Sequence, residues 1–208
     1  HDACRKICIL AAIAFGRHVY PRQVPTEGIS GVALADVAYA ESCNRKIKLL
    51  GRAVKREDGR ICAYVAPHLV DSQAPLAGVE DVFNAIMVKG DAIGDVMFYG
   101  RGAGKLPTAS AVVADVMDAA RHIRSRKRIE WGPGGDDVVV SPEEMSFRWY
   151  VRARGAAETA RAVPGASLLS RPGAPADEVA FLTGSMTRAQ LAGALEALTV
   201  QSVFRVLE

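Results

Sequence analysis

No apolar run in this sequence is long enough to cross a membrane. The longest, Ile7–Phe15, is shorter than the roughly 18 residues that a membrane-spanning helix requires. A strong charge of one sign is also lacking: the net charge is +3, which by itself does not indicate a nucleic-acid partner. Because only 24% of the residues are charged and 50% are hydrophobic, a disordered chain is excluded. The sequence therefore predicts one large or two modest folded domains, with no membrane and no nucleic-acid partner.

Cysteine is scarce, and its spacing excludes the paired C-x-x-C pattern of a structural zinc site. Cys4 and Cys8 are placed to share one face of a helix, either as half of a metal site or as two buried thiols. No histidine-rich segment lies nearby to complete a metal site, so we expect core thiols and no metal. Free thiols in turn predict the reducing environment of the cytoplasm.

Common signatures of hydrolytic catalysis are absent too. The sequence has no G-x-S-x-G nucleophile elbow and no H-E-x-x-H metal motif. His18, His68 and His122 are scattered along the chain, and we expect each of them at the surface or in a capping position. A catalytic centre therefore has to come from other residue types.

What the sequence does have is a helical pattern at its start, followed by a region rich in strands. In Asp2–Phe15 apolar residues recur at the spacing of one buried helix face, and Gly16 follows as a stop signal. The expected elements are helices at 2–15, 34–41 and 107–123, and strands at 46–55, 60–67, 84–89 and 93–99. This order predicts an α+β fold, with an antiparallel or mixed sheet backed by helices.

The helix expected at 107–123 is apolar on much of its surface, so we expect it to be well buried. Pro107 suits the first helical position, where no backbone donor is needed. The helix runs into the basic segment Arg121–Arg128, which indicates either a nucleic-acid patch or compensation of the helix dipole. We favour the dipole, because no aromatic residues alternate with these cations. The glycine-rich segment Trp131–Asp137 is the best candidate domain boundary.

A different organisation follows this boundary. The pattern predicts strands at 147–154, 166–170, 178–183 and 202–207, with helices at 156–162 and 187–198. Thr187 has the side chain of a helix N-cap. The resulting order β-α-β-β-α-β is that of a small ferredoxin-like domain.

A glycine-rich stretch, Phe98–Ser110, lies between an expected strand and an expected helix. A triphosphate-binding loop would need a glycine and a hydroxyl side chain where Tyr99 and Leu106 stand, so that function is excluded. The spacing G-x-G-x-G in Gly100–Gly104 also misses the G-x-G-x-x-G of a dinucleotide-binding turn. The stretch is either a loop that lets a ligand approach a helix N-terminus or a tight turn without a ligand.

Asp2 and Lys6 form the other chemical feature. On the expected helix this spacing makes them project from the same face within pairing distance. A lysine beside apolar neighbours can become a proton donor, and a carboxylate beside it can orient the lysine or a substrate. The same spacing is also typical of an ordinary surface ion pair.

Read together, four segments resemble the homoserine dehydrogenase family. They are DACRK at 2–6, RKIKLLG at 45–51, PLAGVEDVFNAIMVKGDAIGDVMFYGRGAG at 75–104 and PTASAVVADV at 107–116. These segments follow the family's order over most of residues 1–120. The resemblance implies an NAD(P)-dependent oxidoreductase that interconverts L-aspartate 4-semialdehyde and L-homoserine, in threonine, isoleucine and methionine biosynthesis.

The resemblance also implies roles for the residues described above. Lys6 would be the acid–base lysine that delivers a proton to the carbonyl oxygen, and Asp2 would bind the amino-acid substrate beside it. Gly100, Gly102 and Gly104 would line the cofactor side of the cleft, for NADP or NAD.

The resemblance implies a division of the chain as well. Residues 1–124 would be the catalytic region for substrate binding and dimerisation, with the helix at 107–124 returning to a nucleotide-binding domain. Residues 125–144 would be a linker, and residues 145–208 an ACT-like regulatory domain with threonine as its candidate effector. We expect a homodimer or tetramer in the cytoplasm.

Two functions of different classes remain at this point. One is a fragment of the dehydrogenase, because the chain starts without methionine and inside a helical pattern. The alternative is a dimeric regulatory protein that senses an amino acid through its ACT-like tail. Lys6 discriminates between them, since only the enzyme needs this side chain.

The 208-residue chain by itself is expected neither to bind NAD(P)H tightly nor to turn over, because its sequence contains no strand–glycine loop–helix unit of the dinucleotide-binding type. Titration of NADPH, followed by its fluorescence, measures this affinity. A micromolar dissociation constant would contradict the expectation.

Overall fold

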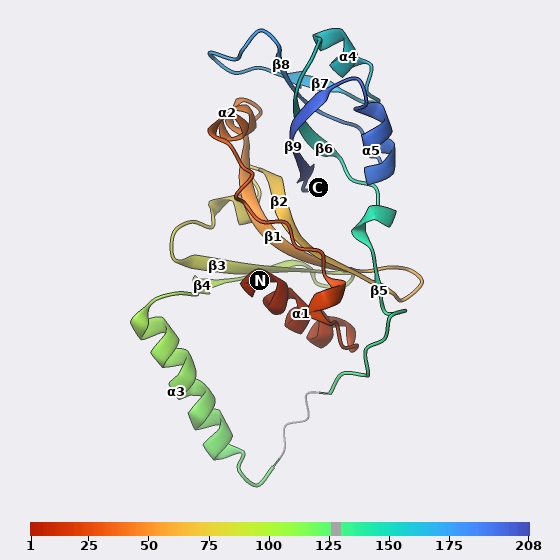
Figure 1. Cartoon of the computed structure of the whole chain (residues 1–208). Coiled ribbons are helices and arrows are strands. Elements are labelled where there is room, and N and C mark those ends of the chain that lie inside the picture. The colour runs from red at the N-terminus through yellow and green to blue at the C-terminus, as the bar shows by residue number, and fades with distance from the viewer. Residues whose placement is uncertain (126–129) are drawn as a thin grey trace. The chain divides into compact units, whose positions relative to one another are not determined.

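The computed structural model of the protein describes residues 1–125 and 130–208 (Figure 1). The described chain forms two compact units, His1–Asp71 with Glu130–Glu208, and Ser72–Ile129. Helices and a mixed seven-stranded sheet are both present, so the expected α+β class is confirmed. Within the described ranges, none of the helices has the length and apolar character needed to pass through a bilayer.

The first unit begins as the sequence predicts. Helix α1 ends at Phe15 and is capped by Gly16, whose φ of 71° is left-handed and whose N–H donates to the carbonyl oxygen of Ala12 at 2.9 Å. A second helix then leads into a hairpin, in which Arg45 lies opposite Asp71. The bounds are α1 (Asp2–Phe15), α2 (Leu34–Ser42), β1 (Arg45–Lys55) and β2 (Ile61–Asp71), with a short 3-10 helix at Pro21–Gln23.

The C-terminal part of this unit has the expected β-α-β-β-α-β order. Thr187 caps the last helix, as predicted: its side-chain oxygen accepts from the N–H of Gln190, although the helix ends at Ala194 rather than at 198. The bounds are β5 (Val139–Val140), β6 (Trp149–Arg154), α4 (Ala157–Arg161), β7 (Ser167–Leu169), β8 (Glu178–Leu182), α5 (Arg188–Ala194) and β9 (Thr199–Val206), with a 3-10 helix at Pro142–Glu144.

One sheet joins the two ends of the chain. Its strand order is β1-β2-β9-β6-β8-β7, with β5 pairing beside β2. The four strands β9-β6-β8-β7 are antiparallel to their neighbours, whereas β2 meets β9 in a short parallel pairing at His68–Leu69. This parallel pairing connects the C-terminal strands to the β1–β2 hairpin.

The sheet is covered on both faces, which explains why β2 is buried along nearly its whole length. Its odd-numbered residues from Ile61 to Val65 pack against α1, and its even-numbered residues from Cys62 to Ala66 join the core under α4 and α5. Helix α2 packs on the opposite side of the C-terminal strands from α4 and α5 (Figure 1), through Tyr39 and Ala40.

The second unit consists of one hairpin and one helix. Its elements are a 3-10 helix at Pro75–Gly78, β3 (Phe83–Gly90), β4 (Gly94–Arg101) and α3 (Lys105–Arg121). Pro107 is the third residue of α3, so its predicted place at the first position is wrong. The predicted burial of this helix is wrong too: none of its residues is buried, and Val112 and Val116 are 58% and 62% exposed. The apolar surface of α3 is therefore not covered by any of the described residues.

Part of the basic segment is described. Arg121 lies in the last turn of α3, where a cation offsets the helix dipole. Residues 126–128, on which the nucleic-acid alternative mainly depended, lie outside the described residues. The expected catalytic region, linker and regulatory domain are defined by their functions, and this division stays a prediction. The compact units of the structure divide the chain at other places, at Asp71 and Glu130.

Candidate active site

The ion pair expected at the start of the chain is present. The Nζ atom of Lys6 lies 2.7 Å from Oδ2 of Asp2, one helical turn apart on α1. Both side chains face solvent, with 64% of Lys6 and 81% of Asp2 exposed. The apolar neighbours further along this face, Ile9 and Ile13, are exposed as well. Exposed ion pairs stabilise a fold only weakly, so the Asp2–Lys6 pair contributes little to the stability of the protein.

The helix that carries this pair is held rigidly. On its buried side Cys4, Ile7 and Cys8 pack against the sheet. A Cβ atom at Gly51 of β1 would lie 3.1 Å from Cβ of Ile7, so the absence of a side chain at Gly51 lets the strand lie close to the helix. The buried positions of Cys4 and Cys8 confirm the predicted core thiols.

The electrostatics of the pair favour its ionised form. The hydrogen bond from Lys6 holds the pKa of the Asp2 carboxyl below its usual value, more than its slight desolvation raises it. The carboxylate therefore stays charged to lower pH than a free aspartate. Its contribution is present at neutral pH and is lost as the pH falls through the lowered pKa.

The glycine-rich segment lies in the second unit: Gly100 belongs to β4, and Gly102 and Gly104 belong to the loop between β4 and α3. Gly100 has open space around the position of a Cβ atom, and Gly104 has a φ of 116°, a conformation that favours glycine. Gly104 is the N-cap of α3, so the loop leads directly to a helix N-terminus. The structure thus brings Asp2 to Lys6, and it places Gly100 at the end of β4 with Gly102 and Gly104 in the loop that follows, while the two groups belong to different units.

Gly102 lies against a side chain that the sequence did not indicate. A Cβ atom at this position would overlap the side-chain amide of Asn84, which comes from the paired strand β3. The N–H of Gly102 donates to the carbonyl oxygen of Val82 at 3.1 Å and keeps the loop against that strand. The start of the loop is therefore held beside β3 by this hydrogen bond and by the contact with Asn84.

The Gly102→Ala substitution is expected to lower the free energy of unfolding by about 1–3 kcal/mol, because the new methyl group overpacks the contact with Asn84. Gly100→Ala is the matched control and should have a much smaller effect, since nothing lies within 4 Å of its Cβ position. Urea unfolding is measured for both single variants and for the double variant Gly102→Ala/Asn84→Ala. The comparison shows how far the effect of Gly102→Ala depends on the Asn84 side chain. Equal effects of the two single substitutions would contradict this account.

The histidines do not form a site, but one of them differs from its prediction. His68 is fully buried, where its Nδ1 lies 2.9 Å from the carbonyl oxygen of Ala66 and its Nε2 3.3 Å from the hydroxyl of Tyr64. Desolvation lowers the pKa of His68 to about 4, so the ring is neutral at physiological pH. It was expected at the surface or in a capping position, because a single histidine carries no sequence signal of burial. Among the described residues, no three potential metal ligands come together.

A buried ionic network was also missed. The carboxylate of Asp36 in α2 is fully buried and accepts from Nε of Arg152 at 2.7 Å, the hydroxyl of Tyr150 at 3.0 Å and that of Ser202 at 2.9 Å. Arg152 also pairs with Glu178 at 3.2 Å. Hydrogen bonding to Asp36 raises the pKa of Arg152, which keeps the guanidinium charged. The network ties α2 to β6, β8 and β9.

An exposed lysine held against a carboxylate, on a helix fixed to an α+β sheet, is suited to proton transfer on a small charged substrate. The sequence profile of the homoserine dehydrogenase family matches residues 1–117, which include this pair and the glycine loop. The chain belongs to the homoserine dehydrogenase family, whose members are oxidoreductases.

Individual relatives agree with this assignment. The chain is 47% identical over 124 residues to homoserine dehydrogenase of Pseudomonas aeruginosa, covering 60% of this chain and 28% of that protein. It is 45% identical over 164 residues to the Synechocystis enzyme, covering 73% of this chain and 37% of that protein. The crystal structure of homoserine dehydrogenase from Thiobacillus denitrificans matches all of this chain with a TM-score of 0.84 and 31% identity, over 53% of that chain. The chain therefore spans about half or less of these relatives.

Proposed function

We propose that this chain is the substrate-binding part of an NAD(P)-dependent homoserine dehydrogenase, which interconverts L-aspartate 4-semialdehyde and L-homoserine. The observation that carries the proposal is the 2.7 Å contact between Lys6 and Asp2, exposed on a rigid helix inside the family match. Both substrates are small amino acids with a positive ammonium group. A carboxylate and a proton-donating lysine are the partners that such substrates need.

In this proposal the two side chains divide the work. Lys6 donates a proton from Nζ to the carbonyl oxygen of the semialdehyde during reduction and accepts it back during homoserine oxidation. Asp2 binds the substrate ammonium group. A carboxylate has two oxygens with about four acceptor positions, so Asp2 can hold Lys6 and a substrate at the same time.

The glycine loop is our proposed contribution of this chain to the cofactor site. The open position at Gly100 and the helix N-terminus after Gly104 fit a negatively charged group that approaches the backbone. The nicotinamide cofactor, NADP or NAD, supplies the hydride chemistry when bound. The role of Gly102 is to keep the loop in shape through its contact with Asn84.

We also propose that the C-terminal strands and helices form an ACT-like regulatory domain that responds to threonine. What supports this is the strand order β9-β6-β8-β7 within the β-α-β-β-α-β succession. The same strand order supports the second candidate function, an amino-acid sensor without dehydrogenase activity. Free thiols at Cys4, Cys8, Cys43 and Cys62 support a cytoplasmic location, and exposed apolar residues on the β3–β4 hairpin support a homodimer or tetramer.

The experiment that tests the proposed function is an assay of the full-length protein with L-homoserine and either NAD or NADP, followed by the absorbance of the reduced cofactor. Homoserine-dependent reduction of at least one cofactor is expected. A protein that reduces neither, yet is stabilised against thermal unfolding by threonine, would be the sensor and would overturn the dehydrogenase.

A further inference from the structure

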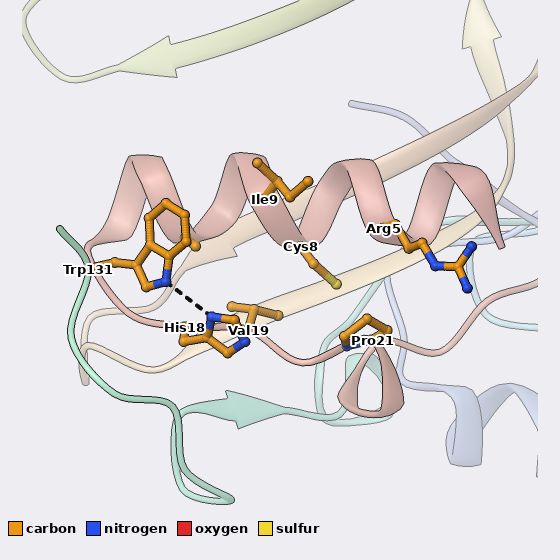
Figure 2. A pocket seen from close by; sticks show the side chains of 8 residues that line it. Arg5, Cys8, Ile9, His18, Val19, Pro21 and Trp131 are labelled. Atoms are coloured by element: carbon orange, nitrogen blue, oxygen red, sulfur yellow. Dashed lines mark hydrogen bonds between the residues drawn. The ribbon is translucent and has the colours of Figure 1, made fainter. Parts of the chain in front are cut away.

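A cavity of about 290 Å³ lies beside α1 (Figure 2). Its wall is formed mainly by apolar groups of α1 and of the segment after it, including Cys8, Ile9 and Pro21. Trp131, which is distant in the sequence, closes one end, and Arg5 lies at the other end (Figure 2). All of these residues belong to the first unit.

The segment that contributes Trp131 is fixed to the wall of the cavity. The backbone of Gly132 exchanges hydrogen bonds with Gly16 and His18, at 2.7 and 3.0 Å. Nε1 of Trp131 donates to Nδ1 of His18 at 3.1 Å, and the two rings stack at 30°. A Cβ atom at Gly134 would lie 2.7 Å from the carbonyl oxygen of His18, so this close approach requires glycine. The cavity is therefore preformed, as binding sites for small molecules usually are.

The charges around the cavity select the ligand. Among the described residues that line the wall, Arg5 is the one charged side chain and none is a carboxylate. Across residues 1–125 and 130–208 its guanidinium has no ion-pair partner. Since His18 accepts from Trp131 through Nδ1, the ring proton is on Nε2, a second donor. The Arg5 cation and the His18 donor suit a ligand with a single negative charge. The apolar walls, with the rings of His18 and Trp131, suit a ligand whose remaining part is flat and apolar.

From this geometry we propose that the cavity binds a small aromatic carboxylic acid, with its carboxylate at Arg5 and its ring between α1 and Trp131. Binding is reversible: burial, together with the neighbouring Cys4, raises the pKa of the Cys8 thiol to about 11, so this thiol is a poor nucleophile. The site is separate from the homoserine chemistry and does not depend on it.

Tryptophan fluorescence of the 208-residue chain tests the proposal with 3-phenylpropionate as the probe. Trp131 is 38% exposed and reports on the cavity, whereas the other tryptophan, Trp149, is 1% exposed. A saturable change is expected. The neutral alcohol 3-phenylpropanol should bind about tenfold more weakly, because it lacks the charge-assisted hydrogen bond to Arg5.

Arg5→Gln should lower the affinity for 3-phenylpropionate about tenfold and remove its advantage over the alcohol. Arg161→Gln, on the exposed surface of α4, is the matched control and should leave both affinities unchanged. No saturable change, equal binding of acid and alcohol, or full affinity in Arg5→Gln would each overturn the proposal. The comparison of acid and alcohol uses the unaltered chain, so it does not depend on the folding of a variant.

Discussion

Replacing Lys6 by alanine in the full-length protein is expected to lower kcat for homoserine oxidation by about 10²–10⁴-fold, the usual contribution of a general acid–base group. The same change should have little effect on folding, because the lysine is 64% exposed and its ion pair with Asp2 lies on the surface. Steady-state assays with saturating cofactor measure kcat and KM, and thermal unfolding checks the fold.

The matched control for this prediction is Lys55→Ala, which removes another exposed lysine of the same unit, at the end of β1. This variant should keep the unaltered kcat. If Lys6→Ala loses activity only in parallel with its stability, Lys6 has a structural role and the proposed proton transfer is wrong. If both lysine variants lose activity equally, the loss reflects net charge rather than chemistry.

Asp36→Ala is expected to destabilise the protein by about 3–5 kcal/mol, the cost of removing one partner from a buried ion pair. The substitution removes the carboxylate that holds Arg152, and Arg152 itself is only 8% exposed. It also removes the hydrogen bond from the N–H of Ala33 at 2.9 Å, which begins α2. Urea unfolding of the 208-residue chain measures the loss.

Asp58→Ala provides the control for the buried network. Asp58 also pairs with an arginine, Arg60 at 2.8 Å, but on the surface, where such pairs contribute about 0–1 kcal/mol. A destabilisation by Asp36→Ala no larger than that by Asp58→Ala would show that the buried network does not hold α2 to the C-terminal strands.

The features that sequence alone could predict depend on residues close together in the chain. The periodicity of Asp2–Phe15 with its glycine stop gave the bounds of α1, and the spacing of Asp2 and Lys6 gave their contact. The order of the C-terminal strands and helices could be read from local alternation and from the cap at Thr187. In each case the deciding interaction spans no more than a few residues.

The features that were missed depend on distant partners. Asp36 resembles an ordinary acidic residue in the first turn of a helix, and only the fold brings Arg152 to it across 116 positions. His68 is buried because β2 meets β9 at this residue, a pairing that no local pattern indicates. Helix α3 is apolar in sequence yet exposed in this chain, because composition does not say which surface covers a helix.

The most direct test of the account is the rate of hydride transfer in a single turnover of the full-length Lys6→Ala protein, with L-aspartate 4-semialdehyde and bound NADPH in rapid mixing. A single turnover separates the chemical step from product release. If Lys6 delivers the proton, NADPH oxidation slows by about 10²-fold or more relative to Lys55→Ala. Hydride transfer at the rate of the unaltered protein would contradict the assignment of Lys6 and, with it, the proposed function of the Asp2–Lys6 pair.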